Sequence, residues 1–289
     1  MRALDAHVHL YPAAVNRDPA AWAAANGEPH WATLCTRRRK DGRPVQLFPN
    51  VDELLRTMDA AGVERSVLLG WYWETPAACA QQNRFYADCV RAHPDRLSAF
   101  ATVHPADGAA LVEVHWAREQ GFCGLGELSP HSLGIAVGDP RWRDVLALAG
   151  ELALPVNLHV TEPESRPFPG RVETPLEDFV ALARDFPGTR FILAHWGGGL
   201  AFQPRMRAAA NVWFDTAASP LLYGPDVWAR AVAAVGAERL LFGSDFPLRL
   251  YPTQEEGDGL ATFVAAAVAN LSPETRDRAL RTNAAALLC

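Results

Sequence analysis

Short apolar runs alternate with amphipathic segments along this chain. Eight such runs can be counted, most of them bounded by Gly or Pro and followed by a helical pattern. This alternation predicts repeated βα units and a parallel sheet. Eight units favour closure into a (β/α)8 TIM barrel rather than an open sheet. The predicted strands are 2–9, 66–71, 97–104, 122–128, 155–160, 190–195, 212–216 and 240–245.

Three of the predicted helices have clear start signals. Thr174-Pro175-Leu176-Glu177 offers a capping hydroxyl, a proline at the first helical position and a glutamate three residues after the cap. Asp139-Pro140 and Ser272-Pro273 repeat the arrangement of a capping side chain followed by proline. We therefore expect a helix to begin at the proline of each pair.

Residues 10–50 interrupt the alternation after the first strand. The segment is far longer than an ordinary βα loop and contains Trp22, Trp31 and several other apolar residues. This content predicts an ordered cap insertion over the barrel mouth, while an extension packed on the barrel side is the alternative. We see no linker and no break in composition, so residues 1–289 are expected to form a single domain distorted by this insertion.

Composition narrows the class of protein. The chain is 49% hydrophobic and 21% charged, as in ordinary globular proteins. A net charge of −6 argues against a nucleic-acid partner. No long apolar window and no signal peptide is evident, so no membrane partner is expected. The five cysteines are odd in number and lack CxxC spacing, which favours a reducing, cytoplasmic location.

Polar side chains occur where several predicted strands end, which is where barrels of this type carry their active sites. His7 and His9 are two residues apart in the first strand and so share a face. His159, His195 and Asp245 end the fifth, sixth and eighth strands. Imidazole and carboxylate are zinc ligands, which predicts one divalent ion on His7, His9, His159 and Asp245. His195 is expected beside the metal-activated water as a base, and Asp245 also as a proton shuttle.

Four further residues are weaker candidates for substrate binding or support of the site. Glu127 ends the fourth strand and would bridge a second metal, bind substrate or pair with a neighbour. Trp71 and Trp73 follow the second strand and would form an aromatic wall for a flat substrate or pack the long loop. Arg249 would meet a substrate carboxylate or lie at the surface.

Several motifs together resemble the amidohydrolase superfamily, and more narrowly its amidohydrolase-related branch, which includes aminocarboxymuconate-semialdehyde decarboxylase. The resemblance implies a distorted TIM barrel, one divalent metal on the four ligands named above, and a histidine that orients the water. Two-metal members have a carboxylated lysine or a glutamate at the end of strand four, and no lysine occurs there in this chain. The motifs are Asp5-Ala6-His7-Val8-His9-Leu10, His159, Ala194-His195-Trp196-Gly197-Gly198, Gly243-Ser244-Asp245-Phe246-Pro247 and Asn283-Ala284.

These observations lead us to expect a metal-dependent hydrolase, in which metal-bound water attacks an amide, lactone or other ester bond of a small molecule. The alternative is a metal-dependent, non-oxidative decarboxylase of a small carboxylated substrate, aromatic or not, on the same scaffold. A barrel that only binds ligands is a third hypothesis, disfavoured because every ligand position is filled. Zinc is the expected ion, although manganese, iron and cobalt suit the same ligands. The sequence leaves the oligomeric state open, although a homodimer is common on this scaffold.

Overall fold

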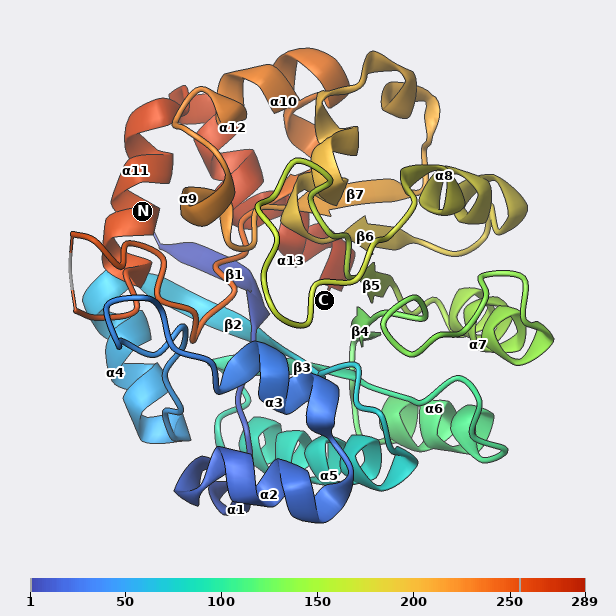
Figure 1. Ribbon diagram of the computed structural model, residues 1–289. Helices are drawn as coiled ribbons and strands as arrows, with labels where there is room; N and C mark the ends of the chain where they lie inside the picture. Colours follow the sequence, from blue (N-terminus) through green and yellow to red (C-terminus); the bar gives the residue numbers. More distant parts are fainter. Residues whose placement is uncertain (1, 255, 289) are drawn as a thin grey trace.

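The structure is a computed structural model that describes residues 2–254 and 256–288. Its centre is a parallel sheet of eight strands that follow one another in chain order (Figure 1). Helices surround this sheet, which confirms the predicted (β/α)8 barrel. The strands are β1 (Ala3–Val8), β2 (Val63–Leu69), β3 (Leu97–Ala101), β4 (Gly124–Leu128), β5 (Val156–Leu158), β6 (Phe191–Leu193), β7 (Val212–Asp215) and β8 (Leu240–Leu241).

The helical segments cover the outside of the sheet. Helices α4, α5, α6, α7 and α8 each follow or join successive strands as the alternation predicts. In chain order, with η marking 3₁₀ and π segments, they are α1 (Ala13–Arg17), α2 (Pro19–Asn26), α3 (Pro29–Cys35), α4 (Val51–Ala61), α5 (Pro76–Ala92), α6 (Ala110–Glu119), α7 (Pro140–Glu151), α8 (Leu176–Asp185), η1 (His195–Phe202), η2 (Pro204–Ala208), α9 (Ser219–Leu222), α10 (Val227–Val235), η3 (Ala237–Arg239), α11 (Leu260–Asn270), α12 (Pro273–Asp277), η4 (Arg278–Thr282) and α13 (Asn283–Leu288).

Backbone hydrogen bonds join the last strand region to the first. The amide of Ala6 donates to the carbonyl of Phe242 over 2.8 Å, and the amide of Asp245 donates to the carbonyl of His7 over 2.9 Å. A parallel bridge pairs Val8 with Phe246. These contacts bring the residues after β8 beside the end of β1, and so place Asp245 next to His7 and His9.

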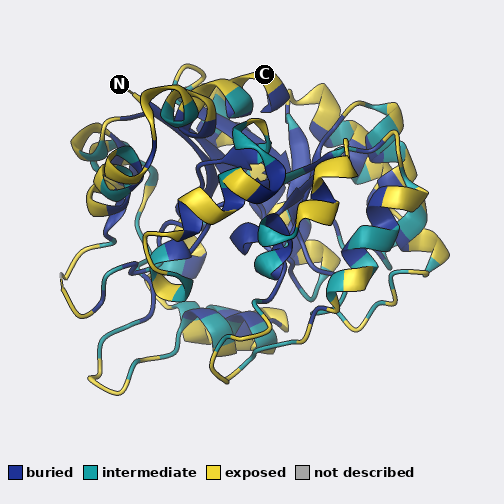
Figure 2. Cartoon of the chain, turned by 90° about the horizontal axis from the view of Figure 1, so that it is seen from above, coloured by how far each residue is buried: buried dark blue, intermediate teal, exposed yellow. Residues whose placement is uncertain are grey.

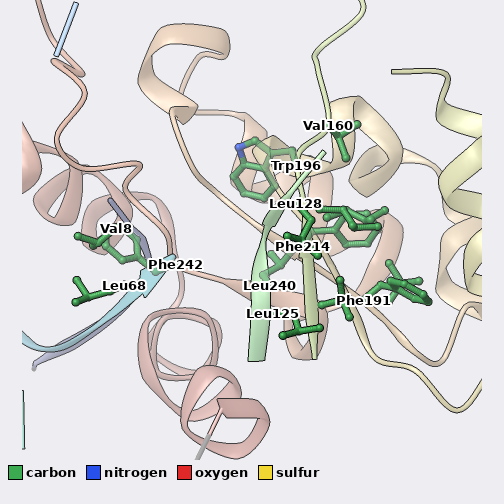
Figure 3. Close-up of a cluster of buried hydrophobic side chains, with 14 of the residues drawn as sticks. Val8, Leu68, Leu125, Leu128, Val160, Phe191, Trp196, Phe214, Leu240 and Phe242 are labelled. Atoms are coloured by element: carbon green, nitrogen blue, oxygen red, sulfur yellow. The ribbon is translucent and has the colours of Figure 1, made fainter. Parts of the chain in front are cut away.

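The core lies between the strands and the helix ring. Figure 3 shows that apolar side chains from and near several strands, such as Val8, Leu125, Phe214 and Phe242, belong to one cluster. In Figure 2 the central strands are buried, while exposed residues lie mainly on the outer faces of helices and in loops. Burial of both sheet faces explains why these strands read as short apolar runs. Among the described residues, no helix is long and apolar enough to span a membrane.

Two of the three predicted helix starts are confirmed. The side chains of Asp139 and Ser272 accept hydrogen bonds at the starts of α7 and α12. Thr174 does not cap α8, which begins at Leu176 without a side-chain cap. Its hydroxyl instead accepts a hydrogen bond from the amide of Thr161 over 2.8 Å. The tertiary contact that closes the loop after β5 thus takes the place of the local cap.

The strands predicted to end near His159, His195 and Asp245 all end earlier than the sequence predicted. His159 follows β5 directly, whereas His195 and Asp245 lie beyond the last residues of β6 and β8. His195 and Asp245 have positive φ values of 56° and 68°, a conformation uncommon for residues with side chains. A positive φ persists where the surrounding structure holds the backbone in place. It directs both side chains away from the hydrogen bonds between the strands.

The insertion is ordered and helical. Helices α1, α2 and α3 occupy it, and its aromatic residues pack with the segment after β2. The ring of Trp31 lies 5.3 Å from that of Trp73, and Trp22 lies at the same distance from Trp73. The insertion also meets the loop after β5, where the His30 Nε2 lies 2.9 Å from the carbonyl of Gly170. That residues 10–50 act as a cap over the mouth stays a prediction.

A buried carboxylate anchors the insertion to the barrel. Glu28 accepts hydrogen bonds from the amides of Glu74 and Thr75 over 2.7 and 2.9 Å, and from the Thr75 hydroxyl over 2.7 Å. We expect Glu28→Ala to lower the free energy of unfolding by about 2–3 kcal/mol, since it leaves buried donors without an acceptor. Urea unfolding monitored by circular dichroism measures this loss.

Asp18→Ala is the matched control within the same insertion. Its carboxylate accepts from the Ala21 amide at an exposed helix start. Its loss should cost only about 1 kcal/mol. Equal effects of the two substitutions would contradict the anchoring by Glu28.

Candidate metal centre

Six side chains of types that can bind a metal converge at the carboxyl end of the barrel. They form two groups, and within each group one ligand atom per residue lies within 4.8 Å of the others. The four predicted ligands therefore lie at the same end of the barrel, but three of them belong to the first group and His159 belongs to the second. The first group is His7, His9 and Asp245, and the second is Glu127, His159 and His195.

Hydrogen bonds fix the tautomers of His7 and His9. The Nδ1 of His7 lies 2.9 Å from Asp215 Oδ2, and the Nδ1 of His9 lies 3.0 Å from the carbonyl of Leu69. Carboxylate and carbonyl oxygens only accept, so both Nδ1 atoms donate. The two Nε2 atoms then face each other at 3.1 Å, and their lone pairs need a positive charge between them. A proton or a metal ion supplies that charge.

Buried carboxylates make this position favourable for a cation. Burial alone would lower the pKa of His7, but the negative Asp215, Glu127 and Asp245 raise it to about 10. Burial and the charge on His7 lower the pKa of His9 to about 3. The pKa of Asp245 is raised to about 6 by burial, against the opposing effect of His7 and His195. The donor types and this charge balance both fit a bound divalent ion.

Glu127 lies between the two groups. Its Oε1 is 2.9 Å from His159 Nδ1 and 3.5 Å from His195 Nε2. Its Oε2 is 3.8 Å from His7 Nε2 and 3.6 Å from His9 Nε2. Burial would raise the pKa of Glu127, but His159, His195 and His7 hold it well below its usual value. The expected partner of Glu127 is therefore present, and the carboxylate spans both groups in its ionised form.

His195 is oriented by the backbone of the next strand's loop. Its Nδ1 donates to the carbonyl of Ala217 over 3.1 Å, which leaves Nε2 directed at the second group, 3.3 Å from His159 Nδ1. Its Nδ1 also lies 3.9 Å from Asp245 Oδ2. His195 thus stands at the junction between the two groups, beside Asp245, the other residue that was predicted to move protons.

Asp215 is a central residue that the sequence reasoning missed. It ends β7, and both of its oxygens are used. Oδ2 receives His7 Nδ1 and the Asn157 side-chain amide over 2.9 and 2.8 Å. Oδ1 receives the amides of His195 and Ala217 over 3.2 and 3.0 Å. Its position at a strand end was the available signal, the same one that selected His159.

A second carboxylate fixes the loop that leads to Asp245. Asp5 Oδ1 accepts from the amides of Ser244 and His7 over 2.9 and 3.1 Å, and Ser244 Oγ donates to Asp5 Oδ2 over 2.5 Å. Burial raises the pKa of Asp5 to about 6 despite these bonds. The Asp5 and Ser244 positions of the quoted motifs therefore hold the loop before Asp245 against β1.

The aromatic residues after β2 divide between two surroundings. Trp71 packs edge-on against His9 with ring centroids 5.3 Å apart, and Tyr72 stacks on Trp71 at 4.5 Å. Tyr72, which lies between Trp71 and Trp73 in the chain, is 5.2 Å from the His159 ring. Trp73 faces the insertion instead, and its Nε1 donates to Gln82 Oε1 over 2.6 Å. Of the predicted pair, only Trp71 lies beside the metal centre.

Arg249 is buried rather than at the surface. Its backbone amide donates to the carbonyl of Val45 over 3.0 Å, and its guanidinium donates to the carbonyl of Glu256. The side chain is therefore engaged by its own loop and its backbone by the insertion. Contact of Arg249 with a substrate stays a prediction.

Comparison with known proteins identifies the family. The amidohydrolase family model matches residues 4–288, which is nearly the whole chain. This chain belongs to the amidohydrolase family. No curated protein matches the sequence significantly.

Solved structures share the fold over their full length. A 5-carboxyvanillate decarboxylase from Sphingomonas paucimobilis is 16% identical with a TM-score of 0.74, covering 100% of this chain and 99% of that chain. A 2,6-dihydroxybenzoate decarboxylase from Rhizobium is 20% identical with a TM-score of 0.67, covering 100% and 98%. A 5-carboxyvanillate decarboxylase from Novosphingobium aromaticivorans, complexed with manganese and 4-hydroxy-3-methoxy-5-nitrobenzoic acid, is 15% identical with a TM-score of 0.75, covering 99% and 96%.

These likenesses correct the expected reaction. Hydrolysis was the main expectation, but these solved neighbours are decarboxylases, which contradicts it and favours the alternative. The preference for hydrolysis rested on how common that chemistry is in the superfamily. The histidine and carboxylate ligands serve both reactions, so they carried no information about which one this barrel performs.

Asp215 offers a direct test of how the centre is supported. We expect Asp215→Asn to weaken divalent metal binding by about 10- to 100-fold, because the amide no longer stabilises His7 as a ligand. Competition with a chromophoric chelator measures this change. Asp139→Asn, at the exposed start of α7, is the control and should bind metal as the wild type does. Unchanged affinity in Asp215→Asn would show that Asp215 does not support the ligand.

Proposed function

We propose that this protein is a metal-dependent, non-oxidative decarboxylase of a small carboxylated aromatic molecule. The observation that carries the proposal is the full-length likeness to decarboxylases, whose named substrates all have a carboxylate on an aromatic ring. The convergence of His7, His9 and Asp245 with the Glu127 group at the barrel's carboxyl end supports it. A small molecule is the partner we propose.

One divalent ion is held by His7, His9, His159 and Asp245 in this proposal. His159 would join them as a neutral imidazole, the form in which histidine binds a metal. Zinc suits these donors, and manganese should be tested beside it because the structure of the decarboxylase from Novosphingobium aromaticivorans contains manganese. The bound ion supplies positive charge that stabilises negative charge developing on the substrate.

His195 donates the proton in the proposed reaction, and Asp245 supports it. Decarboxylation breaks the bond between the ring carbon and the carboxylate, carbon dioxide leaves, and the electron pair left on the carbon takes up a proton. His195 donates that proton from Nε2, the nitrogen left free when Nδ1 is held by Ala217. Asp245 Oδ2, 3.9 Å from His195 Nδ1, favours the doubly protonated ring that this step requires. Burial of these residues keeps bulk water away from the reacting carbon.

The proposal also covers the location of the protein in the cell and its assembly. The odd cysteine count supports a reducing compartment, so we place the protein in the cytoplasm. Cys289, one of those five cysteines, lies outside the described residues. The net charge of −6 gives no reason to propose a nucleic-acid partner. A homodimer stays a prediction that light scattering can check.

Metal content tests the centre independently of any substrate. We expect about one divalent ion per chain in the wild type, measured by plasma mass spectrometry, and its loss in Asp245→Ala. A stoichiometry near two would assign Glu127 as a bridging ligand between two ions. Protein that remains metal-free after reconstitution with zinc and with manganese would rule out the proposed centre.

Activity tests the reaction and the division of roles. Wild-type enzyme should release carbon dioxide from 5-carboxyvanillate or a dihydroxybenzoate in a chromatographic assay. His195→Ala should keep its metal and lose activity by about 100-fold or more, as expected for a proton donor. His159→Ala should lose metal and activity together. Loss of metal from His195→Ala to the same extent would contradict the assignment, and turnover of lactones alone would contradict the reaction.

A further inference from the structure

One buried hydrogen-bond donor beside the metal centre has no acceptor. Trp71 is only 8% exposed, and its Nε1–H finds no partner among the described residues. A buried donor without an acceptor costs about 1–3 kcal/mol. The indoles of Trp31 and Trp142 also lack acceptors, but they are only 1% and 0% exposed, and Trp31 lies in the same apolar cluster as Trp71. Of these three indoles, Trp71 is the one packed against a candidate metal ligand, His9.

The backbone of Trp71 is held rigidly. Its amide donates to Gln82 Oε1 over 2.6 Å, and its carbonyl accepts from the Thr102 hydroxyl over 2.6 Å. The preceding Gly70 leaves no space for a Cβ, which would lie 2.5 Å from Thr102. The indole is thus positioned from α5 and β3 before any ligand arrives, which lowers the entropic cost of binding.

The wall formed by Trp71 and Tyr72 spans both groups of the metal centre. Trp71 packs on His9 of the first group, and Tyr72 packs near His159 of the second. The two rings are stacked on each other at 4.5 Å with planes 25° apart, so their edges lie side by side. Aromatic rings also pack favourably edge to face, and the indole adds a directional donor at its edge.

We propose that Trp71 is a specificity-determining residue whose Nε1–H donates to an oxygen substituent of the substrate other than its carboxylate. The inference rests on the proposed function for its ligand class. Trp71 selects aromatic carboxylates that carry a hydroxyl or methoxyl oxygen, because only these give the buried donor an acceptor while the substrate ring lies beside Trp71 and Tyr72.

Trp71 and Trp73 form a natural matched pair for the test. Trp71→Phe removes the unpartnered donor and keeps an aromatic ring, whereas Trp73→Phe removes a donor that already serves Gln82. Calorimetric titration of the metal-loaded proteins with benzoate and with 2-, 3- and 4-hydroxybenzoate gives the preference for each hydroxyl position. Thermal melts and metal analysis of each variant verify that the fold and the ion are retained.

We expect the wild type to prefer at least one hydroxybenzoate over benzoate by about 5- to 20-fold, the range of one added hydrogen bond. Trp71→Phe should abolish this preference, and Trp73→Phe should keep it. A preference that survives in Trp71→Phe, or a wild type that binds all four ligands equally or none, would overturn the inference.

A second measurement covers the case in which Trp71→Phe does not fold. In wild-type protein with ¹⁵N-labelled indoles, the preferred hydroxybenzoate should shift one of the nine indole N–H resonances downfield, and benzoate should not. That resonance should be the one that bound manganese broadens most. Absence of such a shift would overturn the inference. Binding without carbon dioxide release would instead defeat only the proposed reaction, since these readouts need no turnover.

Discussion

The arrangement of the metal centre depends on one buried carboxylate, Asp215 at the end of β7. It receives the ring of His7, the side chain of Asn157 and the backbone of His195. Burial opposes its charge, but His7 and His195 hold the pKa of Asp215 below its usual value, so it stays ionised. A single side chain thereby fixes the tautomer of a candidate ligand and the position of the proposed proton donor.

Charge balance around Glu127 follows from this constraint. With His7 Nδ1 and His9 Nδ1 committed as donors, their Nε2 atoms face each other and also approach Glu127 and Asp245. Buried negative charge concentrated in this way attracts a cation more strongly than exposed carboxylates do. The same geometry accommodates one ion or two, and for that reason metal stoichiometry, rather than ligand identity, decides the part that Glu127 plays.

The segment after β2 connects this centre to the insertion. Trp71 and Trp73 have different neighbours although they are only two residues apart, because a tight turn, in which the Trp73 amide donates to the Trp71 carbonyl over 2.9 Å, interrupts the extended chain. Gln82 of α5 holds both residues. Trp73 joins the aromatic cluster of the insertion, and Trp71 packs against His9. Packing of residues 10–50 therefore bears directly on where the Trp71 indole lies.

The sequence by itself determined the barrel and the end of it that carries the site. The alternation of apolar runs fixed the number of βα units, and the spacing of His7 and His9 placed them on one face, because both are local, periodic properties. The division of the ligands into two groups, the bridging place of Glu127, the support from Asp215 and the separation of Trp71 from Trp73 were decided only by the tertiary structure. These features depend on distances between strands far apart in the chain, which periodicity does not encode. The choice between hydrolysis and decarboxylation was equally beyond the sequence pattern, since identical ligands serve both reactions.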